Sequence, residues 1–265
     1  MNYAVKQLEQ KPLTLNMIKD IHGILLNSVR GKDKARGDFR KSQNYISKPG
    51  AKIEDALYVP PEPLTLMEHL SNFEKYIHFD EKDRLVQLAV VHAQFEIVHP
   101  FLDGNGRVGR ILIPLFLFEK RVLQSPMFYI SEYLEKNREE YYARLRAITQ
   151  ENKWNEWIEF FLKAVIEQAK TNSVKAKAIL ELYDRKKERI TAVTHSPYAI
   201  KILDTIFRRP IFRTTDFIKI SGIPPATAKR ALKRLKAEKI LSIIEQGSGR
   251  RAEMLIFNKL IAIVE

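Results

Sequence analysis

The sequence contains no cysteine, which excludes disulfides, thiol nucleophiles and thiolate metal sites. Long apolar runs are also missing, since the longest, Ile111–Phe118, is far too short to cross a bilayer. The first residues, MNYAVKQLEQKPL, lack the basic-then-apolar order of a signal peptide. These three absences together predict a cytoplasmic protein with no membrane partner.

Hydrophobic residues nevertheless make up 45% of the 265 residues, enough for a packed core and too many for a disordered chain. This length allows one substantial domain, or one domain with a small appendage. The net charge is +13, and residues 196–265 hold 14 basic against 6 acidic side chains, so +8 of it lies there. A basic surface of this kind suits an acidic partner such as nucleic acid without requiring one.

Apolar spacing predicts a mainly helical first part of the chain. Helices are expected over Leu13–Val29, Leu64–Tyr76, Lys82–Val98, Arg107–Arg121, Asn137–Thr149, Trp154–Ala169 and Lys175–Ile190. Thr14 is expected to cap the first helix, and Pro114 to kink the fourth. Lys82–Val98 is apolar on nearly all sides, which is typical of a helix buried in a bundle. Residues 44–59, ahead of Pro60-Pro61-Glu62-Pro63, are expected to form a short hairpin or extended flap.

The character of the sequence changes after Ser196-Pro197. The segment TTDFIKISGIPPATAKRALKRLKAEKIL predicts a helix-turn-helix, with Thr215 as a cap and Pro224-Pro225 opening the second helix. SIIEQGSGRRAEMLIF predicts two strands around a glycine-rich turn, a wing hairpin. The expected organisation is a first domain at 1–170, a helical linker at 171–195 and a winged helix-turn-helix domain at 196–265.

One stretch between two predicted buried helices, His99–Arg110, reads HPFLDGNGRVGR. Its second half opens a helix, where unpaired N–H groups and the helix dipole favour an anion. Gly104 and Gly106 allow a tight turn and the close approach of a ligand. Arg107 and Arg110 are three residues apart and project on the same side of the helix. Two guanidinium groups beside such an N-terminus suit phosphate oxygens.

Two further side chains complete this pattern. Asp103, next to the expected anion, is well placed to carry Mg²⁺, which bridges phosphates. His99, with an ordinary pKa of about 6.5, can act as a general base near neutral pH. The combination predicts phosphoryl or nucleotidyl transfer, and the sequence contains neither a P-loop nor the Gly-rich loop of protein kinases.

HPFLDGNGRVGR resembles the signature of the Fic family, His-x-Phe-x-Asp/Glu-Gly-Asn-Gly-Arg-x-x-Arg, at every fixed position. The resemblance runs from Asn2 to Ala169 through ALYVPPEP, NREEYYARL and KWNEWIEFF, and the C-terminal domain resembles that of many bacterial Fic proteins. It implies a mainly α fold: a Fic-type helical bundle with a small β-hairpin flap, plus a C-terminal winged helix-turn-helix domain. It also implies adenylylation, in which AMP moves from ATP to a Ser, Thr or Tyr hydroxyl of a target protein and pyrophosphate leaves.

The resemblance implies a role for each matching residue. His99 would deprotonate the target hydroxyl, and Asp103 would bind Mg²⁺. The implied nucleotide contacts are Gly104, Asn105, Gly106, Arg107, Val108, Gly109 and Arg110. The Gly-Asn-Gly segment would cradle the α and β phosphates, and the two arginines would hold the β and γ phosphates.

Three other segments receive implied roles. Phe101 would be the buried anchor of the loop. Tyr141 or Tyr142 would line the adenosine pocket, and the sequence does not distinguish between them. Ile53–Tyr58 would be the flap on which the backbone of the target docks as an added strand.

Alternative interpretations remain open at this point. Glu96 and His99 also fit a Glu-x-x-His di-iron pair, but no second pair stands out. A DNA-binding regulator whose Fic-like part senses nucleotide is another candidate, although a sensor has no use for His99. A Fic enzyme that transfers another phosphate-containing group is a third, against which the intact Gly-Asn-Gly weighs. His92, one heptad before His99, is interpreted as a core histidine.

The basic second helix of the C-terminal domain has two interpretations. Its cations are Lys229, Arg230, Lys233, Arg234 and Lys236. They fit DNA recognition in a major groove, and equally the solvated face of a module for target docking or homodimer formation.

Many Fic relatives carry an inhibitory Ser/Thr-x-x-x-Glu-Gly/Asn helix whose glutamate pairs with the second motif arginine. The only Glu-Asn pair here, Glu151-Asn152, has Ala147 where Ser or Thr should be, and no Glu-Gly pair occurs. The resemblance therefore implies no inhibitory glutamate for Arg110 within this sequence, and self-labelling without an activating signal.

Overall fold

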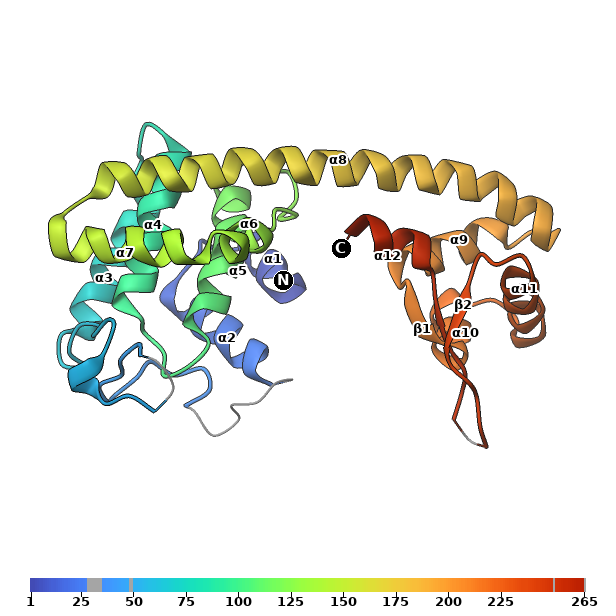
Figure 1. Ribbon diagram of the computed structural model, residues 1–265, viewed down its shortest axis with the longest axis horizontal. Coiled ribbons are helices and arrows are strands. Elements are labelled where there is room, and N and C mark those ends of the chain that lie inside the picture. Colours follow the sequence, from blue (N-terminus) through green and yellow to red (C-terminus); the bar gives the residue numbers. More distant parts are fainter. Residues whose placement is uncertain (28–34, 48–49, 250, 265) are drawn as a thin grey trace. The chain divides into compact units, whose positions relative to one another are not determined.

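The computed structural model describes residues 1–27, 35–47, 50–249 and 251–264 (Figure 1). They form two compact units, Met1–Ala169 and Lys170–Glu265, each with its own hydrophobic core. Three expectations fall outside the described residues: the end of the first helix at Val29, positions 48–49 of the flap, and Arg250 of the wing. In the part of the chain that is described, no helix combines the length and apolar character needed to cross a bilayer.

The first unit is built of helices. In chain order the elements are α1 (Asn2–Leu8), α2 (Leu15–Leu26), the 3₁₀ turn η1 (Ile53–Asp55), α3 (Leu66–His78), α4 (Arg84–Val98), α5 (Asn105–Glu119), α6 (Ser131–Lys136), α7 (Arg138–Glu151) and α8 (Trp154–Thr194). Thr14 caps α2 as expected, since its Oγ1 accepts from Met17 N at 3.3 Å. Helix α8 is continuous where the sequence predicted two helices, because no Gly or Pro interrupts it. It contributes residues to both units.

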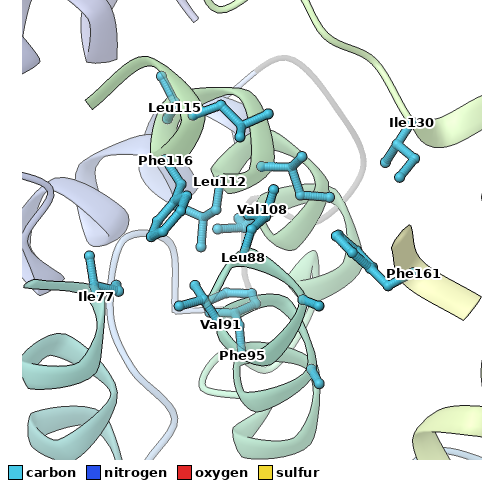
Figure 2. Packing of buried hydrophobic residues seen from close by; sticks show 14 of the residues in the cluster. Ile77, Leu88, Val91, Phe95, Val108, Leu112, Leu115, Phe116, Ile130 and Phe161 are labelled. Carbon is cyan, nitrogen blue, oxygen red and sulfur yellow. The ribbon is translucent and has the colours of Figure 1, made fainter. Parts of the chain in front are cut away.

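Helices α4 and α5 pack against each other in the core of the first unit (Figure 2). Val91 and Phe95 of α4 and Val108 and Leu112 of α5 are each at most 3% exposed, so the predicted burial of α4 is confirmed. Complete burial of one such side chain stabilises the fold by about 1.5–3 kcal/mol. The loop between these two helices, residues 99–104, is therefore anchored at both ends.

Among the described residues of the flap, one β-bridge joins Ile46 and Tyr58, where the sequence predicted a small hairpin. Ile46 N donates to Tyr58 O and Leu57 N donates to Ile46 O, both at 2.8 Å. The ladder does not extend because η1 turns the chain on one side and Pro60-Pro61, which have no N–H groups, follow on the other.

The second unit combines helices with a small antiparallel sheet. After the end of α8 its elements are α9 (Ala199–Arg208), β1 (Ile211–Arg213), α10 (Thr214–Ser221), α11 (Pro225–Ala237), β2 (Ser242–Glu245), β3 (Met254–Ile256) and α12 (Asn258–Val264). The strand order is β1-β3-β2. The predicted helix pair is α10–α11, with Gly222 at φ 61° in the turn, and the predicted hairpin is β2–β3.

The sequence missed β1 and α12 in this unit, and the prediction that Thr215 caps a helix is wrong. Thr214 already opens α10, because its N–H donates to Glu253 O at 3.0 Å as the chain leaves the sheet. Thr215 therefore lies inside the first turn of the helix.

Candidate active site

Helix α4 ends at His99, which adopts the left-handed conformation with φ 48°. Its N–H donates to Phe95 O at 3.1 Å, and its Nδ1 lies 3.3 Å from Glu96 O. Because a carbonyl only accepts hydrogen bonds, Nδ1 carries the proton of the neutral ring and Nε2 keeps its lone pair. Burial lowers the pKa of His99 to about 4, so this lone pair is available at neutral pH.

Hydrogen bonds to Phe101 fix the loop that follows. Asn105 Oδ1 accepts from Phe101 N at 2.8 Å, and its Nδ2 donates to Phe101 O at 2.7 Å. Asn44 Nδ2 donates to the same carbonyl at 2.9 Å. The Phe101 ring is fully buried, as expected of an anchor. The Asn105 side chain is therefore used within the loop, where it holds both backbone groups of Phe101.

Gly104 caps α5 with φ 83°, a conformation that favours glycine. No side chain caps the helix, and the first N–H groups of an α-helix have no partner within it, so this end carries partial positive charge. Asp103 Oδ1 accepts from Gly104 N at 2.7 Å, and the Asp103 side chain is 38% exposed. Among the described residues no three His, Asp or Glu side chains gather to hold a metal, so Asp103 offers a single carboxylate.

The other predicted residues of α5 divide between its two faces. Arg107 Nη2 lies 3.9 Å from Asp103 Oδ1, and Arg110 Nη1 lies 3.2 Å from the point a Cβ on Gly106 would occupy. Val108, in contrast, is fully buried, and its N–H donates to Gly104 O at 3.0 Å. Neither the side chain nor the N–H of Val108 is therefore free for a ligand.

A buried arginine that the sequence analysis missed holds the start of this loop through hydrogen bonds to backbone carbonyl groups. Arg40 is 2% exposed; its Nε donates to His99 O at 3.0 Å and its Nη2 to Pro61 O at 2.5 Å. It binds the carbonyl end of α4, where the helix dipole is negative, and so ties the motif to the base of the flap. A single arginine outside any periodic segment gave no signal in the sequence.

His22 supports the loop from α2. Gly37 N donates to its Nδ1 at 3.0 Å, so the proton lies on Nε2, which donates to Asp103 O at 3.0 Å. Its ring stacks on Phe101 with centroids 3.8 Å apart, and burial lowers the pKa of His22. This contact between α2 and the loop spans 81 residues of sequence, which periodicity cannot reveal.

A cavity of 720 Å³ opens between the flap, α4 and α7. Ile46, Leu57 and Tyr58 line it from the flap, Ile97 from α4 and Tyr142 from α7. Tyr58 OH donates to Ile97 O at 2.9 Å, and burial raises the pKa of Tyr58 to about 12. Mainly apolar walls with a few polar groups are typical of a site for a flat organic ligand.

The structure separates the two tyrosines that the sequence could not distinguish. Tyr142 lines the cavity, and Arg138 lies 5.7 Å from the centroid of its ring. Tyr141 is 6% exposed, and its hydroxyl lies 3.0 Å from Nε2 of His92. His92 is thus a hydrogen-bonded core residue, and burial lowers its pKa to about 3.

Known proteins are similar to this region in sequence and in fold. Residues 12–117 match the Fic/DOC family. A probable protein adenylyltransferase of Aquifex aeolicus is 33% identical over 109 residues, which are 41% of this chain and 29% of that protein. Protein adenylyltransferase Fic of Drosophila grimshawi is 31% identical over 121 residues, which are 44% of this chain and 23% of that protein. The match therefore spans less than a third of these relatives' length.

Solved structures extend the similarity to the fold. A Fic family protein from Desulfovibrio desulfuricans G20 aligns with a TM-score of 0.56 at 16% identity, over 96% of this chain and 72% of that chain. A Fic domain containing signaling protein from Bacteroides thetaiotaomicron aligns with a TM-score of 0.50 at 16% identity, over 64% of this chain and 68% of that chain. At this identity the comparison shows a common fold and nothing about substrates.

Proposed function

We propose that this chain, whose residues 12–117 match the Fic/DOC family, is a protein adenylyltransferase. It would transfer AMP from ATP to a Ser, Thr or Tyr hydroxyl of a target protein and release pyrophosphate. The observation that carries this proposal is the neutral His99, whose free Nε2 stands at the end of α4 beside the uncapped N-terminus of α5. A base beside an anion site is what transfer of a phosphate-containing group requires.

In the proposed reaction, Nε2 of His99 takes the proton of the target hydroxyl. The hydroxyl oxygen attacks the α-phosphorus, the bond from that phosphorus to the bridging oxygen breaks, and pyrophosphate leaves with the electron pair. First-turn N–H groups of α5 from Gly106 and its neighbours stabilise charge on the α and β phosphates. Arg107 and Arg110 hold the β and γ phosphates, which form the leaving group.

Asp103 is the residue that would hold Mg²⁺. A single, partly exposed carboxylate beside an anion site fits this ion, which keeps several waters and binds through one or two carboxylates together with substrate phosphates. When bound, Mg²⁺ would supply positive charge that neutralises the phosphate oxygens.

The cavity beside Tyr142 is the proposed place of the adenosine, because it is mainly apolar and adjoins the end of α4. Residues 53–58 are the proposed docking strand for the target. Ile53 and Leu57 there are 42% and 46% exposed, and the described part of the flap forms one bridge of its own, so an extended segment can pair with it.

The substitution His99→Ala tests the proposed chemistry. Transfer of α-labelled AMP should fall by about 10²–10⁴-fold, the usual effect of removing a general base. Binding of a fluorescent ATP analogue should be retained, because the phosphate cradle is intact. His69→Ala, at an exposed histidine of α3, is the matched control and should leave both unchanged. Undiminished transfer by the His99→Ala protein would remove the proposed role.

We further infer that the second unit is a winged helix-turn-helix module that binds duplex DNA. The observation in favour is the solvent face of α11, where Lys229, Arg230 and Lys233 are exposed and have no ion-pair partner within the described residues. Arg234 and Lys236 are used internally, in contacts with Thr194 O and Glu253 at 2.7 Å each. Like charges one turn apart destabilise a helix, so this cluster favours an anionic partner.

Fluorescence anisotropy with a mixed-sequence duplex at low salt tests this second proposal. The association constant should fall with salt at a slope of about −0.9 per neutralised phosphate. Charge reversal at Lys229, Arg230 and Lys233 should abolish binding. The control makes the same change in net charge at exposed lysines of the first unit, Lys11, Lys136 and Lys163. Absence of binding to any duplex would instead favour protein docking or homodimer formation through α11.

A further inference from the structure

Glu96 connects the cavity with the start of α5. It lies on α4, three residues before His99, and it is one of the residues that line the cavity. Its Oε1 is also 4.0 Å from the point that a Cβ on Gly106 would occupy. On Gly109 an added Cβ would collide with the same oxygen, so the carboxyl group can keep its present position only while residue 109 is a glycine. The Glu96 carboxyl group thus stands where the proposed base cavity meets the proposed phosphate cradle.

One oxygen of the Glu96 carboxyl group makes no hydrogen bond to the described part of the chain. This oxygen, Oε1, is buried. Burial raises the pKa of Glu96 to about 7, against the opposing effect of the Arg110 charge. A buried polar atom without a partner destabilises the fold, and native structures contain only a few such atoms.

The chemistry of a nucleotide supplies the missing partner. In any nucleotide the ribose lies between the base and the phosphates. In the proposed placement, with phosphates at the N-terminus of α5 and the base beside Tyr142, the ribose lies next to Glu96, which contacts both places. Its 2′ and 3′ hydroxyl groups are hydrogen-bond donors, and a carboxyl oxygen accepts in either protonation state. Acidic side chains bind ribose hydroxyls in the same way in dinucleotide-binding folds.

We propose that Glu96 recognises the ribose of the nucleotide by accepting hydrogen bonds from its hydroxyl groups, and so selects ribonucleotides over deoxyribonucleotides. This inference rests on the proposed function for the placement of base and phosphates. It adds a preference for the sugar of the nucleotide to the proposed recognition of its base and phosphates. It also gives Gly109 a role, which is to leave room for the carboxyl group between α4 and α5.

Calorimetric titration of the full chain with ADP and with 2′,3′-dideoxy-ADP tests the proposal. Diphosphates are used because they bind without undergoing transfer. A hydrogen bond to a carboxyl group is worth about 1.5–3 kcal/mol, so ADP should bind at least about tenfold more tightly than dideoxy-ADP. In Glu96→Ala this ratio should fall to about one. Glu96→Gln keeps an acceptor oxygen and should keep part of the preference.

The ratio of the two affinities distinguishes ribose recognition from a structural effect of the substitution. A structural effect would weaken the binding of both ligands equally. Glu139→Ala removes another carboxylate that lines the same cavity and should leave the ratio unchanged. Equal binding of both ligands by the wild-type chain, or an unchanged ratio in Glu96→Ala, overturns the inference while the proposed function stands. Preserved preference in a chain that transfers no AMP contradicts the function alone, and absence of any nucleotide binding contradicts both.

Discussion

Arg40 keeps a positive charge inside the first unit with carbonyl oxygens as its hydrogen-bond acceptors. Two of these, at His99 and Pro61, belong to the motif loop and the base of the flap. A guanidinium group suits this position because its donors point in several fixed directions at once. The position of the catalytic histidine in the proposed mechanism therefore depends on a residue 59 positions away in sequence.

Arg40→Met should destabilise the first unit by about 3 kcal/mol, because it leaves buried carbonyl groups without donors while keeping most of the side-chain volume. Urea unfolding followed by tryptophan fluorescence measures this unit alone, since Trp154 and Trp157 are the two tryptophans of the chain and both lie in it. Lys41→Met, at the exposed neighbour, should change stability by less than about 0.5 kcal/mol. Similar effects of the two substitutions would contradict the role given to Arg40.

Two buried histidines predict how the stability of the first unit depends on pH. Burial lowers the pKa of His92 to about 3 and that of His99 to about 4, from 6.5. The unfolded chain therefore binds more protons below pH 6.5, and each histidine removes up to about 1.4 kcal/mol per pH unit as the pH falls toward its folded pKa. Glu96 acts in the opposite sense: its pKa is raised from 4.5 to about 7, so its contribution is lost as the pH rises through that range.

Urea unfolding at a series of pH values between 4.5 and 6.5 measures the sum of these effects. Two histidines outweigh one glutamate, so the free energy of unfolding should fall as the pH is lowered. His92→Gln should make this slope shallower, and Glu96→Gln should make it steeper. A stability that stays constant or increases toward pH 4.5 would show that these groups are not buried as described.

At the scale of a single element, the start of α5 depends on the left-handed conformation of Gly104. A Cβ there would make ordinary contacts, the nearest being Arg107 Nη2 at 3.5 Å, so the cost of Gly104→Ala is the backbone strain of φ 83°. That strain amounts to about 1–2 kcal/mol, and its relief would tilt the N–H groups of the first turn. We expect weaker binding of ADP as well as lower stability.

Gly222→Ala is the matched control for Gly104→Ala. It imposes similar strain at φ 61°, with no neighbouring atom in the way, in the turn between α10 and α11. Calorimetry should show unchanged ADP affinity for this variant. If both variants, or neither, weaken ADP binding, the N-terminus of α5 is not the phosphate cradle.

Apolar spacing predicted most helices of the first unit. Helices α2, α3, α4, α5 and α7 were expected with ends within a few residues of those found. The failures have local causes. α8 is one helix because no Gly or Pro interrupts it, and the part of the flap that the structure describes forms one bridge because the prolines that follow lack N–H donors. β1 is three residues long and is defined by its partner β3, which a local pattern cannot indicate.

At the scale of the whole molecule, the candidate site was predictable only where it is contiguous in sequence. The motif brings His99, Asp103 and Arg107 together by spacing alone. Arg40 and His22, in contrast, reach the motif from distant segments, and only folding brings them there. The same holds for the choice of Tyr142 over Tyr141, which depends on how α7 faces the cavity. A sequence thus specifies the reactive groups of this site better than the residues that position them.

The two units divide the proposed activities between them. The match to the Fic/DOC family and the cavity both lie in residues 1–169, whereas the exposed cations of α11, which form no ion pair with the described residues, lie in residues 170–265. Each unit has a separate core. The proposal of AMP transfer by the first unit and the proposal of DNA binding by the second can therefore be tested independently. The central claim concerns the first unit and the phosphorus atom at which transfer occurs.

Parallel incubation of the full chain and a cell lysate with ATP labelled at the α-phosphate or at the γ-phosphate tests that claim most directly. With Mg²⁺ present, label from the α-phosphate should become covalently bound to protein, with release of one pyrophosphate for each AMP attached. Label from the γ-phosphate should stay in solution, and His99→Ala should attach neither. Protein-bound label from the γ-phosphate would show phosphoryl transfer instead, and equal α-labelling by wild type and His99→Ala would contradict the account.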